Sequence, residues 1–220
     1  MEKYAIITAM QSEFDAVKSL YAFTGNDKQA RAKVGNKELI LIKSGMGKVN
    51  GALAAYDACL DGVDLVINTG LAGGIDSSLD QGDIVLAQKV CYHDVYCGEG
   101  NAIGQVQNLP LYYETPKDLV QKIAEKAPHF KCGLTVTGDQ FLTDPARLKE
   151  IKKLFPEALA VDMESAAMAQ TCYINKIPFI SLRIISDVVG KENQSEQYNN
   201  FWQNMPHQAA EMLDLAIKAL

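Results

Sequence analysis

Residues 159–187 read LAVDMESAAMAQTCYINKIPFISLRIISD, and this stretch decides the fold class. The run from Ala158 to Val161 is short and apolar, which predicts the end of a buried strand. Residues 165–169 are mostly small helix formers, which predict a helix that can lie close to a sheet. Residues 177–185 are mainly apolar and β-branched, which predicts a second buried strand. Strand, helix and strand in this order indicate an α/β fold.

Two carboxylates, Glu164 and Asp187, stand where the predicted helix begins and where the second strand ends. Ligands of open α/β sheets bind at the carboxyl ends of the strands. Each acid also has an ordinary structural explanation, because a carboxylate is favourable in the first turn of a helix and Asp is a common turn residue. Two acids at the ends of neighbouring strands, with Arg183 between them in the chain, favour a functional site.

The composition predicts a globular protein without nucleic-acid or membrane partners. The 220 residues are 48% hydrophobic and 22% charged, which is ordinary for one α/β domain over residues 1–220. A net charge of −6 opposes phosphate binding by a nucleic-acid interface. The five cysteines form no C-x-x-C pair, which predicts reduced, buried thiols, and the three scattered histidines make a metal site unexpected. Because the sequence has no signal peptide and no apolar run long enough to cross a bilayer, we expect a soluble, cytoplasmic protein.

The rest of the chain predicts strands and helices around one mixed sheet. A Gly-Asn pair at residues 35–36 predicts a β-hairpin. The glycine turn at residues 45–50 matches neither a dinucleotide fingerprint nor a P-loop, but could hold an anion or a hydroxyl at a helix start. The glycines of residues 69–74 let the backbone approach a ligand or another chain segment closely. Further strands are predicted at residues 4–8, 64–68, 82–93 and 133–137. Further helices are predicted after residues 9–13 to about residue 21, and at 51–61, 116–127, 144–154 and 209–220.

Three other features have no decisive explanation in the residues alone. Glu13 follows the first strand, where a helix acid is the simpler interpretation. Residues 95–110 form a long loop with apolar side chains, which is typical of a functional or interface loop. The polar residues 190–197 are the best candidate for a mobile lid.

Seven short motifs, taken together and in order, resemble the nucleoside phosphorylase superfamily and cover essentially the whole chain. They are AMQSE (9–13), SGMGKVN (44–50), NTGLAGG (68–74), YHD (92–94), TGDQF (137–141), VDMES (161–165) and RIISD (183–187). The most similar branch is the 5′-methylthioadenosine/S-adenosylhomocysteine nucleosidases. The resemblance implies one α/β domain with a central mixed β-sheet flanked by helices, and hydrolysis of an N-glycosidic bond without metal or organic cofactor.

The implied chemistry explains the residue types. A purine leaves poorly unless its N7 is protonated, which needs a carboxylic acid with a raised pKa. The resemblance assigns this acid to Asp187 and the base that activates the attacking water to Glu13, a division of labour like that of inverting glycosidases. It places Glu164 and Met163 at the ribose hydroxyls and Arg183 beside them. The remaining implied substrate contacts are Met10, Ala72, Gly73, Phe141, which would stack on the purine, and Leu142.

The chain departs from the family pattern at two positions. Leu71 stands where many such nucleosidases have Ser, which removes a hydroxyl from the site. Asp162 stands where Glu is common, and we expect this change to matter less.

Three alternatives to the nucleosidase function stay open. The first is a purine nucleoside phosphorylase, although Asn68 replaces the arginine that would bind phosphate. The others are a futalosine or aminofutalosine nucleosidase and a nucleoside-binding protein without catalysis. Besides a purine nucleoside, the resemblance implies a second copy of the chain as partner, because the family usually forms homodimers in which a loop from one subunit completes the other's pocket.

Overall fold

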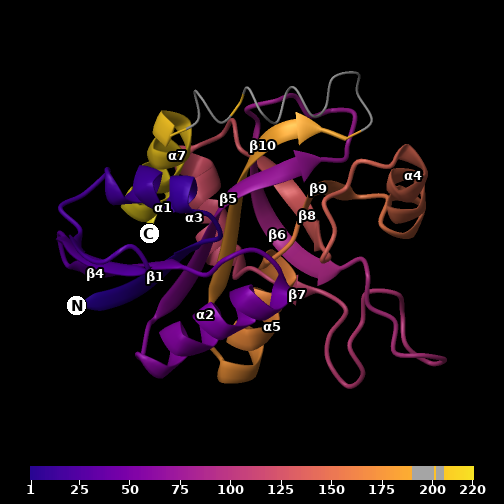
Figure 1. Cartoon of the computed structure of the whole chain (residues 1–220), viewed down its shortest axis with the longest axis horizontal. Helices are drawn as coiled ribbons and strands as arrows, with labels where there is room; N and C mark the ends of the chain where they lie inside the picture. Colours follow the sequence, from indigo (N-terminus) through magenta and orange to yellow (C-terminus); the bar gives the residue numbers. More distant parts are fainter. Residues whose placement is uncertain (190–200, 202–205) are drawn as a thin grey trace.

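The computed structural model describes residues 1–189, 201 and 206–220, and all structural statements refer to these. Its strands form one ten-stranded mixed sheet with helices on both faces (Figure 1), which confirms the predicted fold class. The strands are β1 (Glu2–Thr8), β2 (Thr24–Gly25), β3 (Gln29–Val34), β4 (Lys37–Lys43), β5 (Leu65–Gly74), β6 (Ile84–Tyr92), β7 (Tyr113–Glu114), β8 (Lys131–Thr137), β9 (Ala158–Asp162) and β10 (Phe179–Val188). The helices are α1 (Gln11–Lys18), α2 (Lys48–Leu60), α3 (Lys117–Lys126), α4 (Pro145–Leu154), α5 (Ser165–Asn175) and α7 (Pro206–Ala219).

Part of the sheet closes into a barrel-like ring. β5 pairs in parallel with β10, β10 pairs antiparallel with β6, and β6, β8 and β9 follow in parallel. β9 closes the ring through antiparallel pairing with the end of β5, at Gly73 and Gly74. The prediction that β9 and β10 are direct neighbours is therefore wrong, since β5 lies between them.

The amino-terminal strands extend the sheet beyond the ring. β1 pairs in parallel with both β4 and β5. β3 and β4 pair antiparallel, which confirms the hairpin predicted at Gly35 and Asn36. The end of β1 lies beside the middle of β5, with Ile7 paired to Asn68, so β5 extends beyond β1 at the carboxyl edge that the two parallel strands share.

The two faces of the sheet carry different helices. The small residues of α5 are buried, and α2 packs beside it at Gly51, where a Cβ would lie 3.2 Å from the Cβ of Glu164. α1, α3 and α7 cover the other face through side chains such as Phe14, Ile123 and Leu213. Figure 1 shows α2 and α5 side by side below the ring, and α1, α3 and α7 grouped at the upper left.

Several predicted boundaries needed correction. β5 continues through the glycine-rich motif to Gly74 rather than ending at Asn68. β10 runs past Ser186 and Asp187, and its pairing register shifts between Ile185 and Asp187, which marks a β-bulge. Both motifs therefore belong to paired strands rather than to free loops. α7 begins at Pro206, three residues before the helix predicted at residues 209–220.

Other predictions have mixed outcomes. Residues 95–110 contain no helix or strand, in agreement with the predicted loop. All cysteines are free, but only Cys91 and Cys172 are buried, so the prediction of buried thiols is wrong for the others, and Cys97 is exposed. Within the described ranges, no helix is both long enough and apolar enough to cross a membrane. The segment 190–197, predicted as a lid, lies outside the described residues.

Candidate active site

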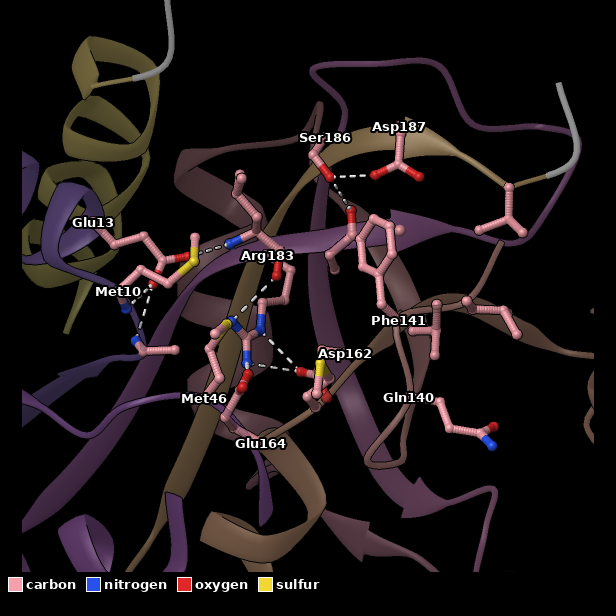
Figure 2. A pocket seen from close by; sticks show the side chains of 18 residues that line it. Met10, Glu13, Met46, Gln140, Phe141, Asp162, Glu164, Arg183, Ser186 and Asp187 are labelled. Carbon is pink, nitrogen blue, oxygen red and sulfur yellow. Dashed lines mark hydrogen bonds and ion pairs between the residues drawn. The ribbon is translucent and has the colours of Figure 1, made fainter. Parts of the chain in front are cut away.

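The pocket in Figure 2 brings together every site residue predicted from the sequence. Its walls come from the β1–α1 junction, the ends of β5 and β10, the turn after β9 and the loop after β8. Counted together with its open mouth, the space inside it is about 640 Å³. The predicted residues that line it are Met10, Glu13, Ala72, Gly73, Phe141, Leu142, Met163, Glu164, Arg183 and Asp187.

The Glu13 carboxylate is held at the junction of β1 and α1 by backbone N–H groups. Its Oε2 accepts hydrogen bonds from the N–H groups of Ala9 and Met10, and its Oε1 accepts one from Leu71, each at 2.9 Å. Burial raises the pKa of Glu13, while the nearby Arg183 guanidinium and these N–H groups act in the opposite direction. A fixed carboxylate with a raised pKa suits proton acceptance near neutral pH.

Gly70 provides the space that the Glu13 carboxylate occupies. The φ of Gly70 is +150°, and a Cβ at this position would lie 2.4 Å from Oε1 of Glu13 and 3.0 Å from Nη1 of Arg183. Of the two possibilities that the sequence left open for this glycine, close approach to a ligand or to another segment, the structure shows approach to another segment.

Arg183 connects the acidic groups on the ribose side of the predicted site. Its side chain is fully buried, and its Nη2 lies 2.8 Å from Oδ2 of Asp162 and 3.1 Å from Oε2 of Glu164. Its Nη1 donates to the carbonyl of Leu71 at 3.3 Å. Burial alone would lower the pKa of Arg183, but Asp162, Glu164 and Glu13 raise it, so the guanidinium stays charged.

Glu164 is the N-cap residue of α5 and faces the pocket. Its Oε1 accepts a hydrogen bond from the N–H of Gly47 at 3.0 Å, and its Oε2 pairs with Arg183. Burial raises the pKa of Glu164, opposed by Arg183 and reinforced by Asp162. The glycine turn predicted as an anion site therefore binds a carboxylate of the protein itself.

Asp187 lies across the pocket from Glu13 (Figure 2). Its side chain is 2% exposed, and the hydroxyl of Ser186 lies 2.5 Å from its Oδ1. The pairing register of β10 shifts between Ile185 and Asp187. The side chains of the consecutive residues Ser186 and Asp187 can therefore contact each other, although side chains normally alternate along a strand.

The loop after β8 forms the wall next to Asp187. Leu142 is buried, whereas Phe141 is 56% exposed, and Figure 2 shows its ring extending toward Asp187. An exposed aromatic face over a pocket can stack on a planar base.

Sequence reasoning missed several lining residues. Met46 and Gln140 line the pocket within motifs that had been identified, but neither carries a side chain that signals chemistry. Ser186 also lines it, and its position next to Asp187 was the available signal. Asn68 is not a lining residue, since it is buried and its Nδ2 donates to Ser165 at 2.9 Å.

The charge of the pocket is predominantly negative. Among the described lining residues, Arg183 is the only cation, and the acids are Glu13, Asp162, Glu164 and Asp187. In the described part of the chain, no group of three or more His, Cys, Asp or Glu side chains is placed to hold a metal ion.

Comparisons with known proteins agree on one family. The model of the phosphorylase superfamily matches residues 3–220. A 5′-methylthioadenosine/S-adenosylhomocysteine nucleosidase from Anoxybacillus flavithermus is 39% identical over 190 residues, covering 83% of this chain and 81% of that protein.

Solved structures give the same picture. A putative 5′-methylthioadenosine/S-adenosylhomocysteine nucleosidase from Borrelia burgdorferi B31, bound to adenine, superimposes with a TM-score of 0.92 at 32% identity, covering 99% of this chain and 100% of that chain. A mutant of futalosine hydrolase from Helicobacter pylori superimposes with a TM-score of 0.91 at 26% identity, covering all of both chains.

Proposed function

This chain belongs to the 5′-methylthioadenosine/S-adenosylhomocysteine nucleosidase family of the phosphorylase superfamily, and from this premise we propose how its pocket cleaves the substrate. The protein is a hydrolase that cleaves the N-glycosidic bond of these nucleosides and releases adenine.

One observation supports the proposal most strongly. Two buried carboxylates, Glu13 and Asp187, lie on opposite sides of one pocket, and Phe141 extends over the side of Asp187 (Figure 2). A purine stacked on Phe141 would lie next to Asp187, and its sugar would then point toward Glu164 and Glu13. Two carboxylates on opposite sides of a sugar are what inversion by water requires.

Asp187 acts as the acid. It donates a proton to N7 of the purine as the bond between C1′ and N9 breaks, so the electron pair leaves with a neutral base. The proximity of the Ser186 hydroxyl, at 2.5 Å, fixes the orientation of the carboxyl group.

Glu13 acts as the base. The ribosyl group develops positive charge at C1′, and water attacks from the face opposite the purine while Glu13 takes up its proton. The carboxylate of Glu13 is held by three backbone N–H groups, those of Ala9, Met10 and Leu71. Each carboxylate oxygen can accept two hydrogen bonds, so these three leave room for one from water.

Glu164 binds the ribose hydroxyls, with Met163 beside it and Ala72 and Gly73 along the sugar. Arg183 keeps Glu164 ionised and oriented, because its guanidinium pairs with that carboxylate at 3.1 Å. A charged acceptor binds hydroxyls more strongly than a neutral one.

Water rather than phosphate is the nucleophile, since the pocket repels anions. Arg183 is already neutralised by Asp162 and Glu164, and the described lining offers no other cation for a phosphate.

The test is adenine release from 5′-methylthioadenosine with and without phosphate, with identification of the sugar. Free 5-methylthioribose at equal rates supports hydrolysis, whereas a sugar 1-phosphate formed only with phosphate would contradict it. Binding without any release would indicate a protein without catalysis.

A futalosine-type substrate is a second candidate. It is supported by the similarity to the futalosine hydrolase of Helicobacter pylori over the whole chain. Comparing kcat/KM for methylthioadenosine and aminofutalosine decides between the two substrates, and we expect methylthioadenosine to be preferred.

We also infer that the protein forms a homodimer through an exposed apolar surface on α2 and α5. Val49, Leu53 and Leu60 are 59–70% exposed and recur at spacings that place them on one face of α2, next to the exposed Tyr173 and Ile174 of α5. Met46, just before α2, lines the pocket, so a partner on this surface would lie near its mouth.

Sedimentation should show a dimer for the native chain and for the control Leu154→Glu on α4, and a monomer for Leu53→Glu. A native chain that sediments as a monomer contradicts this.

A further inference from the structure

The first turn of α2 is capped by two carboxylates from other parts of the chain. Its N-cap residue, Gly47, has no side chain that could accept the free N–H groups of a helix start. The N–H of Gly47 donates to Oε1 of Glu164 at 3.0 Å, and the N–H of Lys48 donates to Oδ1 of Asp139 at 2.8 Å. One carboxylate belongs to the ribose side of the pocket, and the other directly precedes Gln140 and Phe141.

Asp139 is tied to this helix by several polar contacts. The Nζ of Lys48 lies 2.8 Å from Oδ2 of Asp94 and 3.8 Å from Oδ2 of Asp139. The N–H of Asp139 donates to the same oxygen of Asp94 at 3.0 Å. The YHD, TGDQF and SGMGK segments therefore meet at one point, although they are far apart in the sequence.

The packing around these bonds leaves little room for the loop to shift. At Gly47, whose φ is +92°, a Cβ would lie 3.1 Å from Oδ1 of Asp139. At Gly138, a Cβ would lie 2.4 Å from Nε2 of the buried His93 ring. The loop is thus fixed by His93 at Gly138 and by α2 at Asp139, immediately before the aromatic wall of the pocket.

We propose that Asp139 is a positioning residue that links the purine side of the pocket to Glu164 through the first turn of α2. It does not line the pocket, and its side chain is 46% exposed. The adjacent N–H groups of Gly47 and Lys48 bind the two carboxylates. They therefore set the distance between Glu164 and the loop that carries Phe141. The consequence for turnover rests on the proposed function, whereas the linkage itself is a property of the fold.

The kinetic test compares substitutions that remove different parts of the contact. Asp139→Ala leaves the N–H of Lys48 without its acceptor, so we expect KM for methylthioadenosine to rise about tenfold and kcat to fall severalfold. Asp139→Asn retains an oxygen acceptor at the same place and should remain within about threefold of the native enzyme. The matched control is Asp64→Ala, which removes an exposed carboxylate that accepts from the N–H of Lys3 at 2.8 Å, at the opposite end of the sheet.

Two kinetic results would overturn the proposal. One is an Asp139→Ala enzyme that loses thermal stability as the Asp64→Ala control does but keeps native KM and kcat. The other is an Asp139→Asn enzyme as impaired as Asp139→Ala, which would mean that the acceptor for Lys48 is not what matters.

A second readout does not need activity. Amide hydrogen exchange of Gly47, whose N–H bonds Glu164, should accelerate at least tenfold in Asp139→Ala and not in Asp139→Asn or Asp64→Ala. Unchanged exchange would refute the linkage. An inactive native chain would refute the proposed function, and the exchange experiment would still decide this proposal.

Discussion

The sharpest prediction concerns Gly70, a residue without a side chain next to the proposed base. In Gly70→Ala the new Cβ would lie 2.4 Å from Oε1 of Glu13, so the carboxylate must move by about 1 Å to reach an ordinary contact. That movement breaks the hydrogen bond of Glu13 with the N–H of Leu71, which costs about 1.5–3 kcal/mol. The φ of +150°, which residues with a side chain rarely adopt, adds about 1–3 kcal/mol. Since a 1 Å misplacement of a reacting group costs about 100-fold in rate, we expect kcat/KM to fall by about 100-fold or more.

The assay is adenine release together with the free energy of unfolding in denaturant. Gly62→Ala is the control, because Gly62 also has a positive φ, +70°, but no atom lies within 4 Å of its Cβ position. The control should lose about 1 kcal/mol of stability and keep native kinetics. A Gly70→Ala enzyme within tenfold of the native kcat/KM would refute the assignment of Glu13 as the base held by this contact.

Three further predictions concern the buried Arg183 and His93 and the partly buried Leu71. Arg183→Met should lower the free energy of unfolding by about 3–5 kcal/mol, because it leaves the buried carboxylates of Asp162 and Glu164 without their cationic partner. A loss below about 1 kcal/mol, measured by unfolding in denaturant, would contradict the pairing. Burial lowers the pKa of His93, so the unfolded chain takes up its proton first. Stability should therefore be full above about pH 6.5, decline as the pH falls from there to the lowered value, and level off below it. His93→Gln should remove that part of the pH dependence in unfolding measurements, and an unchanged profile would show that another group causes it. Leu71→Ser should lower the free energy of unfolding by about 1–2 kcal/mol, since this side chain packs against the core. It should keep kcat within about threefold, because Leu71 contacts Glu13 and Arg183 only through its backbone N–H and C=O. A 100-fold change in kcat would show that the side chain itself matters.

The sequence predicted the local elements well because their signals are local. The strand-helix-strand unit at residues 158–187, the hairpin at Gly35 and the helix start at Asp144 were all predicted correctly. The carboxylate of Asp144 accepts a hydrogen bond from the N–H of Ala146 at 2.8 Å. What could not be predicted is long-range pairing. Closure of the ring inserts β5 between β9 and β10, and no periodicity in either strand encodes that partner.

The candidate site shows the same division. Acids at strand ends were recognisable, but the partners that fix them come from distant segments: Glu13 is held by the N–H of Leu71, and Glu164 by the N–H of Gly47. Backbone donors leave no mark in a sequence. Asp162 illustrates the limit, because the sequence shows only a change from the family's Glu, whereas its buried ion pair with Arg183 is visible only in the structure.

The most direct test of the central claim is the dependence of Asp187 on the leaving group. Native enzyme and Asp187→Asn are compared on methylthioadenosine and on a 5-methylthioriboside that carries 4-nitrophenolate, which departs without protonation. If Asp187 supplies the proton, Asp187→Asn loses about 10²–10⁴ in kcat/KM on the purine substrate and less than about tenfold on the nitrophenyl riboside. Equal losses on both substrates would contradict the account, because Asp187 would then act through binding or folding rather than through the purine's proton.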